Sequence, residues 1–274
     1  MKPVATVSEV FDAIQHAKAG APDFCTNFFP VQKKVQDWID HDELRGSFRT
    51  DAVFFFRRDR DFWHLYYCAA SKRALEREIS GVPEIGSERV VLDLVGNEAA
   101  VSVPVGVWKA AGFDQRTRLF RMARVAQPFT ESVKEANGKI EFANIADGPS
   151  IIDLLESAFD RFGEQLPLLY EIEAAIGSKQ VLVARYEEKI AGLLFFETQG
   201  MSSTLRFWAV AEQYRALKFG SALMRRYFAT QSTVKRFVLW VAADNVNAVQ
   251  KYGHYGYKPD GLVDYVLANR MVRS

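Results

Sequence analysis

The sequence is poor in the residues that build metal centres and disulfide frameworks. Two cysteines, Cys25 and Cys68, occur among 274 residues, and the four histidines show none of the spacings of metal ligands. Both cysteines lie beside apolar residues, which favours buried free thiols and a reducing compartment. We therefore expect neither a metal site nor disulfide bonds.

An excess of charge of one sign and long apolar runs are also missing. The formal net charge is +1, whereas a protein that binds nucleic acid normally has a clear basic excess. No apolar run approaches the roughly 20 residues of a membrane-spanning helix, and residues 1–10 lack the apolar core of a signal peptide. With 49% apolar and 25% charged residues, the composition is typical of soluble globular proteins. We expect a cytoplasmic protein that binds neither nucleic acid nor membranes.

A polar stretch divides the chain into two halves. Residues 127–138 contain proline, threonine, serine and glycine between segments that each have their own strands and helices. We predict a first domain at 1–126, a linker at 127–138 and a second domain at 139–274. In the first half, the patterns predict a helix that Ser71 caps, a helix at 31–44, and strands at 53–56, 62–67, 90–95 and 118–125.

The second half has a similar order of elements. Periodicity and turn residues predict helices at 150–162, 166–176, 217–230 and 245–255, and strands at 140–143, 180–185, 190–196, 204–210, 237–241 and 262–267. Each half has a glycine–aromatic pair before its last strand, namely Gly112-Phe113 and Gly256-Tyr257. A duplicated fold explains this parallel, and two unrelated α/β domains are the alternative.

The most informative stretch runs from Arg215 to Leu223, between an apolar run and a helical pattern. A helix N-terminus carries partial positive charge and unpaired N–H groups, which suit a phosphate. Gly220, Ser221 and Ala222 are small enough to let a ligand approach, and Arg215 adds a full positive charge. Taken alone, the stretch also fits an ordinary capped helix.

A second pattern follows about two dozen residues later and reads Asn245-x-x-Ala248-x-x-x-Tyr252-x-x-x-Gly256-Tyr257. Asn245 can cap the helix after a buried strand, and Ala248 and Tyr252 lie on one face of that helix. A tyrosine there keeps its proton at neutral pH and can donate it to a thiolate leaving group. By itself, Tyr252 also fits a packed aromatic residue.

The two patterns together resemble the signature of the GCN5-related N-acetyltransferase (GNAT) superfamily. That signature is a Q/R-x-x-G-x-G/A turn followed by N-x-x-A-x-x-x-Y-x-x-x-G-F/Y; residues 215–220 read RALKFG, with Lys218 at the first glycine position. The resemblance covers residues 140–270. It implies an α/β fold of two tandem GNAT-like domains, each a mixed, mostly antiparallel sheet flanked by helices, with a cofactor cleft between splayed strands in the C-terminal one. The N-terminal domain, which lacks both patterns, is then a degenerate copy that shapes the substrate site or serves structure alone.

The resemblance also implies where acetyl-CoA binds. The pantetheine arm pairs with a strand, the pyrophosphate meets helix N–H groups, and Tyr252 is the general acid. The implied cofactor-binding residues are Ala209, Val210, Arg215, Leu217, Lys218, Phe219, Gly220, Ser221, Ala222, Asn245, Ala248 and Tyr252. Lys218 can donate its N–H from ordinary helical dihedrals, but a lysine is costly there if the position needs a positive φ.

A general base must remove a proton from the amine before it attacks the thioester. Glu197, at the end of a predicted central strand, is the first candidate. Glu171 and Glu173 on a neighbouring predicted helix come next, and a chain of water molecules is a further alternative.

The predicted activity is therefore an acyl-CoA-dependent N-acyltransferase, with acetyl-CoA as donor and a small-molecule or peptide amine as acceptor, in a monomer or homodimer. The alternative is a non-catalytic module on the same fold that binds acyl-CoA or another small ligand, since Lys218 departs from the signature and no base is obvious. A two-domain scaffold for a partner explains neither pattern.

Overall fold

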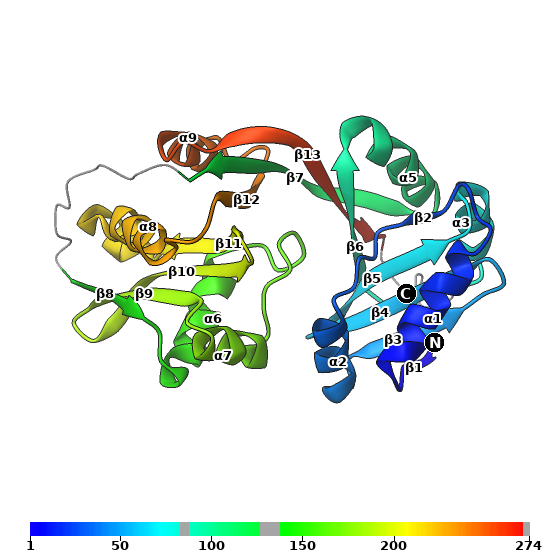
Figure 1. Ribbon diagram of the computed structural model, residues 1–274, viewed down its shortest axis with the longest axis horizontal. Helices are drawn as coiled ribbons and strands as arrows, with labels where there is room; N and C mark the ends of the chain where they lie inside the picture. The colour runs from blue at the N-terminus through cyan, green and yellow to red at the C-terminus, as the bar shows by residue number, and fades with distance from the viewer. Residues whose placement is uncertain (83–87, 127–137, 271–274) are drawn as a thin grey trace. The chain divides into compact units, whose positions relative to one another are not determined.

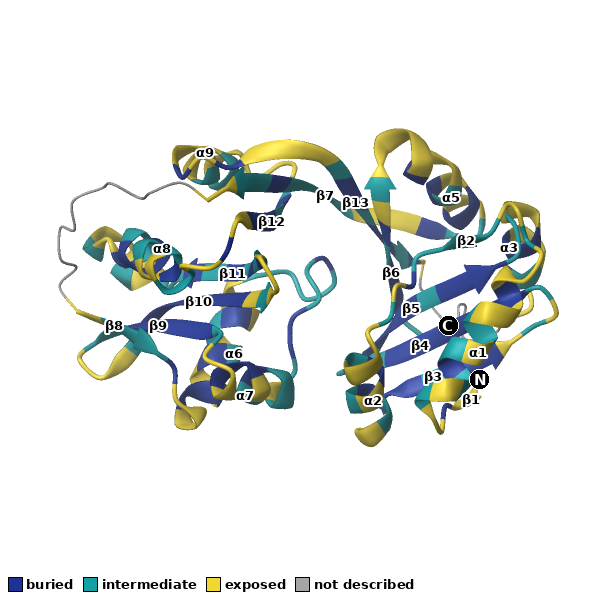
Figure 2. Ribbon diagram, in the orientation of Figure 1, coloured by how far each residue is buried: buried dark blue, intermediate teal, exposed yellow. Residues whose placement is uncertain are grey.

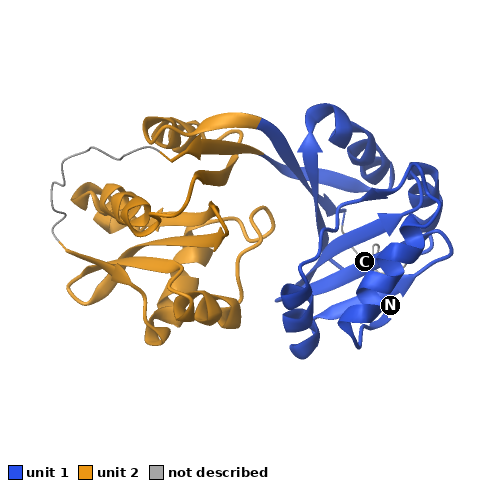
Figure 3. Ribbon diagram, in the orientation of Figure 1, with its two compact units in different colours: residues 1–119, 261–274 blue, residues 120–260 orange. Residues whose placement is uncertain are grey.

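The computed structural model describes residues 1–82, 88–126 and 138–270 (Figure 1). The chain forms two compact units (Figure 3): unit 1 comprises residues 1–119 and 261–274, and unit 2 comprises residues 120–260. The predicted linker at 127–138 lies, apart from Gly138, outside the described residues.

Unit 1 has the strand order β1-β3-β4-β5-β6-β13. Its paired strands are antiparallel except β5 and β6, which are parallel. The predicted helix at 31–44 ends earlier, at Asp40, because Asp42 has a φ of 55° that an α-helix cannot contain. The elements of unit 1 are β1 (Lys2–Pro3), α1 (Val7–Lys18), β2 (Cys25–Thr26), α2 (Gln32–Asp40), β3 (Leu44–Phe48), β4 (Ala52–Asp59), β5 (Phe62–Ala69), α3 (Lys72–Ile79), β6 (Val90–Asn97), α5 (Glu98–Ala110) and the first part of β7 (Phe113–Val125).

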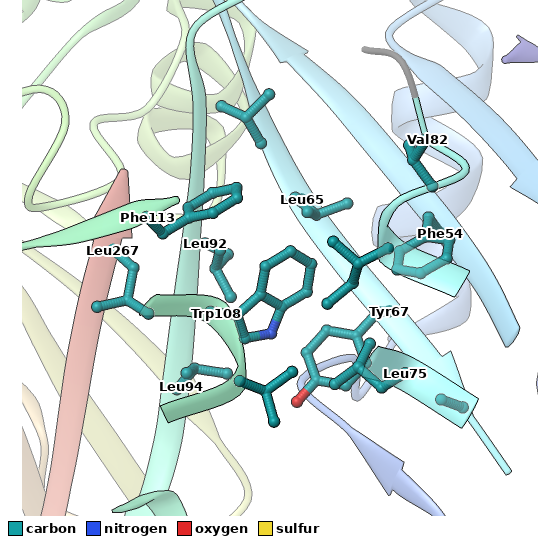
Figure 4. Packing of buried hydrophobic residues seen from close by; sticks show 14 of the residues in the cluster. Phe54, Leu65, Tyr67, Leu75, Val82, Leu92, Leu94, Trp108, Phe113 and Leu267 are labelled. Atoms are coloured by element: carbon teal, nitrogen blue, oxygen red, sulfur yellow. The ribbon is translucent and has the colours of Figure 1, made fainter. Parts of the chain in front are cut away.

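The core of unit 1 is built around Trp108, which is completely buried. Figure 4 shows its indole ring between Tyr67 of β5 and Phe113 of β7, whose ring centroids lie 5.5 and 5.0 Å away. Successive residues of β4 pack on opposite faces of the sheet, Phe54 in this cluster and Phe55 in the cluster under α1 and α2. The strand aromatics thus form a core, as aromatic residues in strands usually do.

Unit 2 has the strand order β7-β12-β11-β10-β9-β8. Alternate residues of β9 face α6 and α7 on one side of the sheet and α8 on the other (Figure 2). The predicted helix at 150–162 ends at Ala158, because Phe159 is extended. The elements are β8 (Lys139–Phe142), the 3-10 helix η1 (Ile145–Asp147), α6 (Gly148–Ala158), α7 (Leu169–Gly177), β9 (Val181–Tyr186), β10 (Lys189–Gln199), β11 (Ser202–Val210), the 3-10 helix η2 (Glu212–Leu217), α8 (Phe219–Thr230), β12 (Arg236–Ala242), α9 (Val246–His254) and the start of β13 (Lys258–Asn269).

Each unit takes one strand from the other half of the sequence. Leu262–Ala268 of β13 pair with Val91–Asn97 of β6 in unit 1, and β7 lies next to β12 in unit 2. The compact units therefore divide the chain differently from the predicted domains, since residues 261–274 belong to unit 1 rather than to a domain at 139–274. Sequence order alone gives no sign of this exchange. In each half the last strand follows a helix and a glycine with a positive φ, Gly112 or Gly256, so the two strands have the same sequence context.

Candidate functional site

The parallel neighbours β11 and β12 pair along only part of their length. Ser202–Leu205 pair with Arg236–Leu239, and beyond them no residue that the structure describes pairs with Arg206–Val210 on that side. Arg206–Val210 are called the free edge of β11 below. This edge contains the backbone on which the predicted pantetheine site depends.

A β-bulge lies where the free edge begins. Consecutive residues of β10 face Leu205 and Phe207, which leaves Arg206 as an extra residue in β11. Such a bulge bends its strand, increases the twist and reverses which side chains face which side. Leu205 and Trp208 therefore both pack in the cluster beneath α8, whereas Phe207 packs in the cluster beneath α6 and α7.

Helix α8 follows β11 and the 3-10 helix η2, and it begins without a side-chain cap. Lys218 precedes the helix at φ 60° and ψ 19°, in the left-handed region, and no side chain of the described residues accepts the first N–H groups. Ala222 donates its N–H to the Lys218 carbonyl at 3.3 Å, so by helix geometry Phe219–Ser221 are the residues whose N–H groups have no partner in the preceding turn. The first glycine position of the turn does need a positive φ, at a cost to lysine of about 1–2 kcal/mol.

Two cations flank this helix start. Lys218 is exposed, and Arg215 in η2 is 70% exposed, with a 3.8 Å ion pair to Glu212, which is 88% exposed. Surface pairs of this kind contribute little, so the guanidinium remains available to an anion. Leu217 is the last residue of η2 and so lies before the helix.

The structure gives Gly220 a packing role in addition to the predicted one. A Cβ at this position would lie 3.2 Å from Cζ2 of Trp208, so the missing side chain lets α8 pack on the indole ring. Trp208 also contacts Tyr252, with ring centroids 5.6 Å apart. Its indole Nε1 is buried and has no hydrogen-bond partner among the described residues. An N–H donor without a partner thus lies beside the first turn of α8.

The second motif forms the start of α9. The side chain of Asn245 accepts the N–H of Ala248 at 3.1 Å and caps the helix, which is its structural role. Tyr252 packs against Trp208 on one side and Tyr257 on the other, at 5.6 and 6.0 Å between centroids. Burial, and the nearby carboxylate of Glu164, raise the pKa of Tyr252 well above its ordinary value. The phenol therefore keeps its proton at neutral pH.

Two of the three carboxylates that the sequence favours as bases have partners in the structure. Glu197 is exposed and lies 3.5 Å from the guanidinium of the bulged Arg206. Glu171 accepts the N–H of Leu168 at 2.8 Å and caps α7. Glu173 is half-buried and lies beside Gly148 at the start of α6.

Sequence reasoning missed Glu164, in the segment between α6 and α7. Burial raises the pKa of Glu164 to about 7, with a smaller contribution from the negative charge of Asp160. The negative charge of Glu164 in turn makes a smaller contribution than burial to the raised pKa of Tyr252. Gly163 and Pro167 on either side of it were the available signal that this segment is not helical.

These features fit an extended thioester with a diphosphate. The free edge of β11 can hold the arm, while Phe219–Ser221 and the two cations suit the diphosphate. Among residues 1–82, 88–126 and 138–270, no group of histidine, cysteine and acidic side chains is placed to hold a metal ion. Within the same ranges, no helix has the length and apolar character needed to span a bilayer.

Comparison with known families agrees with this geometry. Residues 152–266 match the family model described as Acetyltransferase (GNAT) domain, which confirms the resemblance predicted from the two motifs. The match extends into β13, up to residue 266, although this strand pairs with β6 in unit 1. No curated protein matches the chain.

Solved structures share the fold over the length of the chain. A tandem GNAT protein from the clavulanic acid biosynthesis pathway, in a structure without AcCoA, has a TM-score of 0.63 at 10% identity and covers 100% of this chain and 98% of its own. A GCN5-related N-acetyltransferase from Sphaerobacter thermophilus has a TM-score of 0.58 at 13% identity, over 100% and 96% of the two chains. Another from Kribbella flavida has a TM-score of 0.57 at 11% identity, over 87% and 93%. The chain therefore has the tandem GNAT-like fold that the sequence predicted.

Proposed function

We propose that this chain is an acyl-CoA-dependent N-acyltransferase that transfers an acetyl group from acetyl-CoA to a primary amine of a small molecule or peptide. The observation that carries the proposal is the separation of β11 from β12. It leaves the backbone of Arg206–Val210 free next to an uncapped helix start, and Trp208 links both to Tyr252.

Each part of the donor has a matching group in unit 2. The free edge of β11 accepts the pantetheine arm as if it were an added strand. The N–H groups of Phe219–Ser221, with Arg215 and Lys218 beside them, bind the diphosphate. The positive φ of Lys218 then has a function, because it aims the first turn of α8 at the ligand.

The chemistry needs a proton donor and a carbonyl-polarising group. Acyl-CoA supplies the acyl group as a thioester. Tyr252, whose burial keeps it protonated, donates to the departing sulfur. A backbone N–H of the free edge, near Val210, stabilises negative charge on the thioester oxygen.

A non-catalytic module that binds acyl-CoA or another small ligand is the second candidate. This candidate is favoured because Glu197 is exposed and forms an ion pair with Arg206. The carboxylate that the sequence predicts as the base is then not reserved for catalysis. In either case unit 1 is proposed to shape the acceptor site or to serve structure alone.

Thermal unfolding with and without millimolar acetyl-CoA tests the proposal. A ligand present at 100 times its Kd stabilises the native state by about 2.7 kcal/mol, so the unfolding midpoint must rise. Acetyl transfer to a panel of primary amines is then measured for the wild type and for Tyr252→Phe. We expect this variant to keep the midpoint shift and to lose roughly 100-fold or more in kcat.

The outcomes separate the two candidates. A midpoint that does not move at millimolar acetyl-CoA contradicts the donor site. A midpoint that rises without turnover of any amine supports the binding module. Tyr214→Phe is the matched control, because the ring of Tyr214 packs at a tilt against Tyr186, with centroids 5.6 Å apart, and we expect this variant to keep its turnover.

A further inference from the structure

The segment between α6 and α7 lies against the free edge of β11. Helix α6 ends at Ala158, and the extended Phe159 packs on Phe207, with ring centroids 5.1 Å apart. Leu166, at the other end of the segment, is buried in the same cluster. The chain between these two anchors, including Glu164, is therefore held beside the residue that follows the bulge.

Tyr252 reaches the same place from the other face of the sheet. It packs on Trp208, the next residue of β11, and Trp208 points to the face opposite that of Phe207. At this point β12 no longer pairs with β11, so no paired strand lies between groups on the two faces of the sheet. The charge of Glu164 accordingly acts on the phenol of Tyr252.

The surroundings of Glu164 leave its carboxylate without a competing partner. Within the described part of the chain it has no hydrogen bond and no ion pair, in contrast to Glu171, which caps a helix, and Glu197, which faces Arg206. The groups that act on it electrostatically are Asp160 from its own segment and Tyr252 from α9. A carboxyl with a pKa of about 7 exchanges protons readily at neutral pH.

We infer that Glu164 is the general base of the proposed acyl transfer and removes a proton from the acceptor ammonium beside the free edge of β11. This inference rests on the proposed function. Glu164 takes the first ammonium proton and later releases it to solvent. The carbon–nitrogen bond then forms, the carbon–sulfur bond breaks, and Tyr252 gives its proton to the sulfur. The second proton that the nitrogen loses returns to Tyr252, so charge and protons balance.

The first experiment compares pH profiles of kcat/KM for the wild type, Glu164→Gln and Glu197→Gln, with acetyl-CoA and the amine of the panel that reacts fastest. We expect the wild-type rate to fall below about pH 7, and Glu164→Gln to lose roughly 100-fold at neutral pH. The deficit must shrink at high pH, where the free amine no longer needs a base. A structural defect would instead lower the rate equally at all pH values. Glu188→Gln, an exposed carboxylate in the β9–β10 turn, is the matched control and should behave as the wild type.

A second variant moves the pKa without removing the base. Asp160→Asn takes away the neighbouring negative charge, and an asparagine Oδ1 can still accept the N–H of Phe162, which Asp160 accepts at 3.2 Å. We expect the acidic limb of the profile to shift to lower pH while the maximal rate is kept.

Protein stability provides a readout that does not depend on turnover. The raised pKa of Glu164 stabilises the fold when the carboxyl is protonated, and this contribution is lost as the pH rises through about 7. Glu164→Gln should therefore unfold at a higher temperature than the wild type at pH 8–9, and the difference should vanish below pH 4.

The possible results bear on separate claims. If amines are acetylated but Glu164→Gln keeps the wild-type profile, or if Glu197→Gln alone removes the acidic limb, Glu164 is not the base and only this inference fails. If Glu164→Gln shows no pH-dependent gain in stability, the carboxyl is not buried as described and the inference fails as well. If no amine is acetylated and no midpoint shift occurs, the proposed function itself fails.

Discussion

Both units separate two parallel strands, but the chain itself fills the separation in unit 1 and leaves it free in unit 2. In unit 1, β5 and β6 pair only at Trp63–Val90 and His64–Val91. Unit 2 repeats this arrangement, since β11 and β12 pair only as far as Leu205. The same architecture can therefore present a binding edge or bury it, and one short segment makes the difference.

That segment is β2 and the residue after it. β2 adds to β5 as an antiparallel strand, and Asn27 then spans the separated strands. Its Oδ1 accepts the N–H of Tyr67 at 2.7 Å, while its Nδ2 donates to the carbonyls of Leu65 at 3.0 Å and Asp93 at 3.1 Å. These contacts satisfy backbone groups that correspond to those that unit 2 is proposed to offer to pantetheine.

The helices that follow the two separated strands, α3 and α8, also differ in whether a side chain caps their first N–H groups. Ser71 caps α3 by accepting the N–H of Ala74 at 3.1 Å, whereas α8 has Lys218 at its start and no side-chain cap. A cavity of about 960 Å³ still adjoins Ser71 and Asn27 in unit 1. Unit 1 thus has space for a ligand, but its hydrogen-bonding groups at this place already have partners within the chain.

The last helix of each unit keeps its cap but not its phenol. Asn97 accepts the N–H of Ala100 at 2.9 Å in α5, as Asn245 does for Ala248 in α9. Four residues beyond the alanine, α5 has Pro104 where α9 has Tyr252. Unit 1 therefore lacks a proton donor at this position.

Removing the bridge in unit 1 should have the largest effect. Asn27→Ala leaves the N–H of Tyr67 and two carbonyls without their partner, and each unsatisfied buried group costs about 1–3 kcal/mol. We expect a loss of about 3 kcal/mol in the free energy of unfolding, measured by urea denaturation. Isothermal titration of wild type and variant with acetyl-CoA should give one site per chain in both. Two sites in the wild type would contradict the comparison.

A carboxylate introduced at the start of α8 or of α3 tests the difference between the two units. Ser221→Glu places a carboxylate in the first turn of α8, which helix electrostatics tolerate but which repels a diphosphate. We expect the Kd for acetyl-CoA to rise roughly 100-fold, about 2.7 kcal/mol, without loss of thermal stability. Arg73→Glu in the first turn of α3 is the matched control and should leave the Kd unchanged. Equal effects from both variants would mean that the donor does not bind in unit 2 alone.

The sequence predicted the parts of this comparison that depend on local signals. The caps Ser71 and Asn245, the turn at 215–220 and the strands that lead to them were all apparent from residue type and spacing. Such features satisfy nearby backbone groups, so residues within a few positions determine them. The tandem architecture was predicted from the similar order of elements in the two halves, from the glycine–aromatic pair in each and from the family resemblance.

The remaining features depend on contacts between distant segments. The bulge at Arg206 exists only relative to β10, Gly220 is small because Trp208 packs on it, and Asn27 joins strands 38 and 66 residues away. Glu164 was missed because its role depends on burial and on Tyr252, far along the chain. No periodicity encodes these relations, since they arise only when the strands are in register.

Each unit also has a carboxyl whose pKa is raised, namely the half-buried Glu164 in unit 2 and the buried Asp264 in unit 1, and the two should differ in function. Burial, and then the charge of Asp93, raise the pKa of Asp264 on β13 in unit 1. Its stabilising protonated form is lost as the pH rises through the folded-state pKa, so the wild type has an uncompensated buried charge at higher pH. We expect Asp264→Asn to increase the free energy of unfolding by at least about 1 kcal/mol at pH 8, with no gain below pH 3.

Acetyl transfer provides the contrast for that variant. Glu164→Gln should lose turnover, whereas Asp264→Asn should keep it, because Asp264 pairs β13 with β6 in unit 1. A stability gain that does not depend on pH would show that Asp264 is not protonated in the fold. Parallel losses of turnover in both variants would contradict the assignment of the reaction to unit 2.

The two asparagine caps allow the smallest and most closely matched test. Asn97→Ala and Asn245→Ala each remove one bond to the third residue of a helix, at 2.9 and 3.1 Å, so each should cost about 1 kcal/mol in urea unfolding. Only Asn245→Ala loosens the helix that holds Tyr252 against Trp208. It should therefore weaken acetyl-CoA binding and lower kcat several-fold, whereas Asn97→Ala changes neither. If both variants lower turnover in proportion to their loss of stability, the cap of α9 acts through folding alone. The functional difference between α5 and α9 then depends on one corresponding position, which is Pro104 in α5 and Tyr252 in α9.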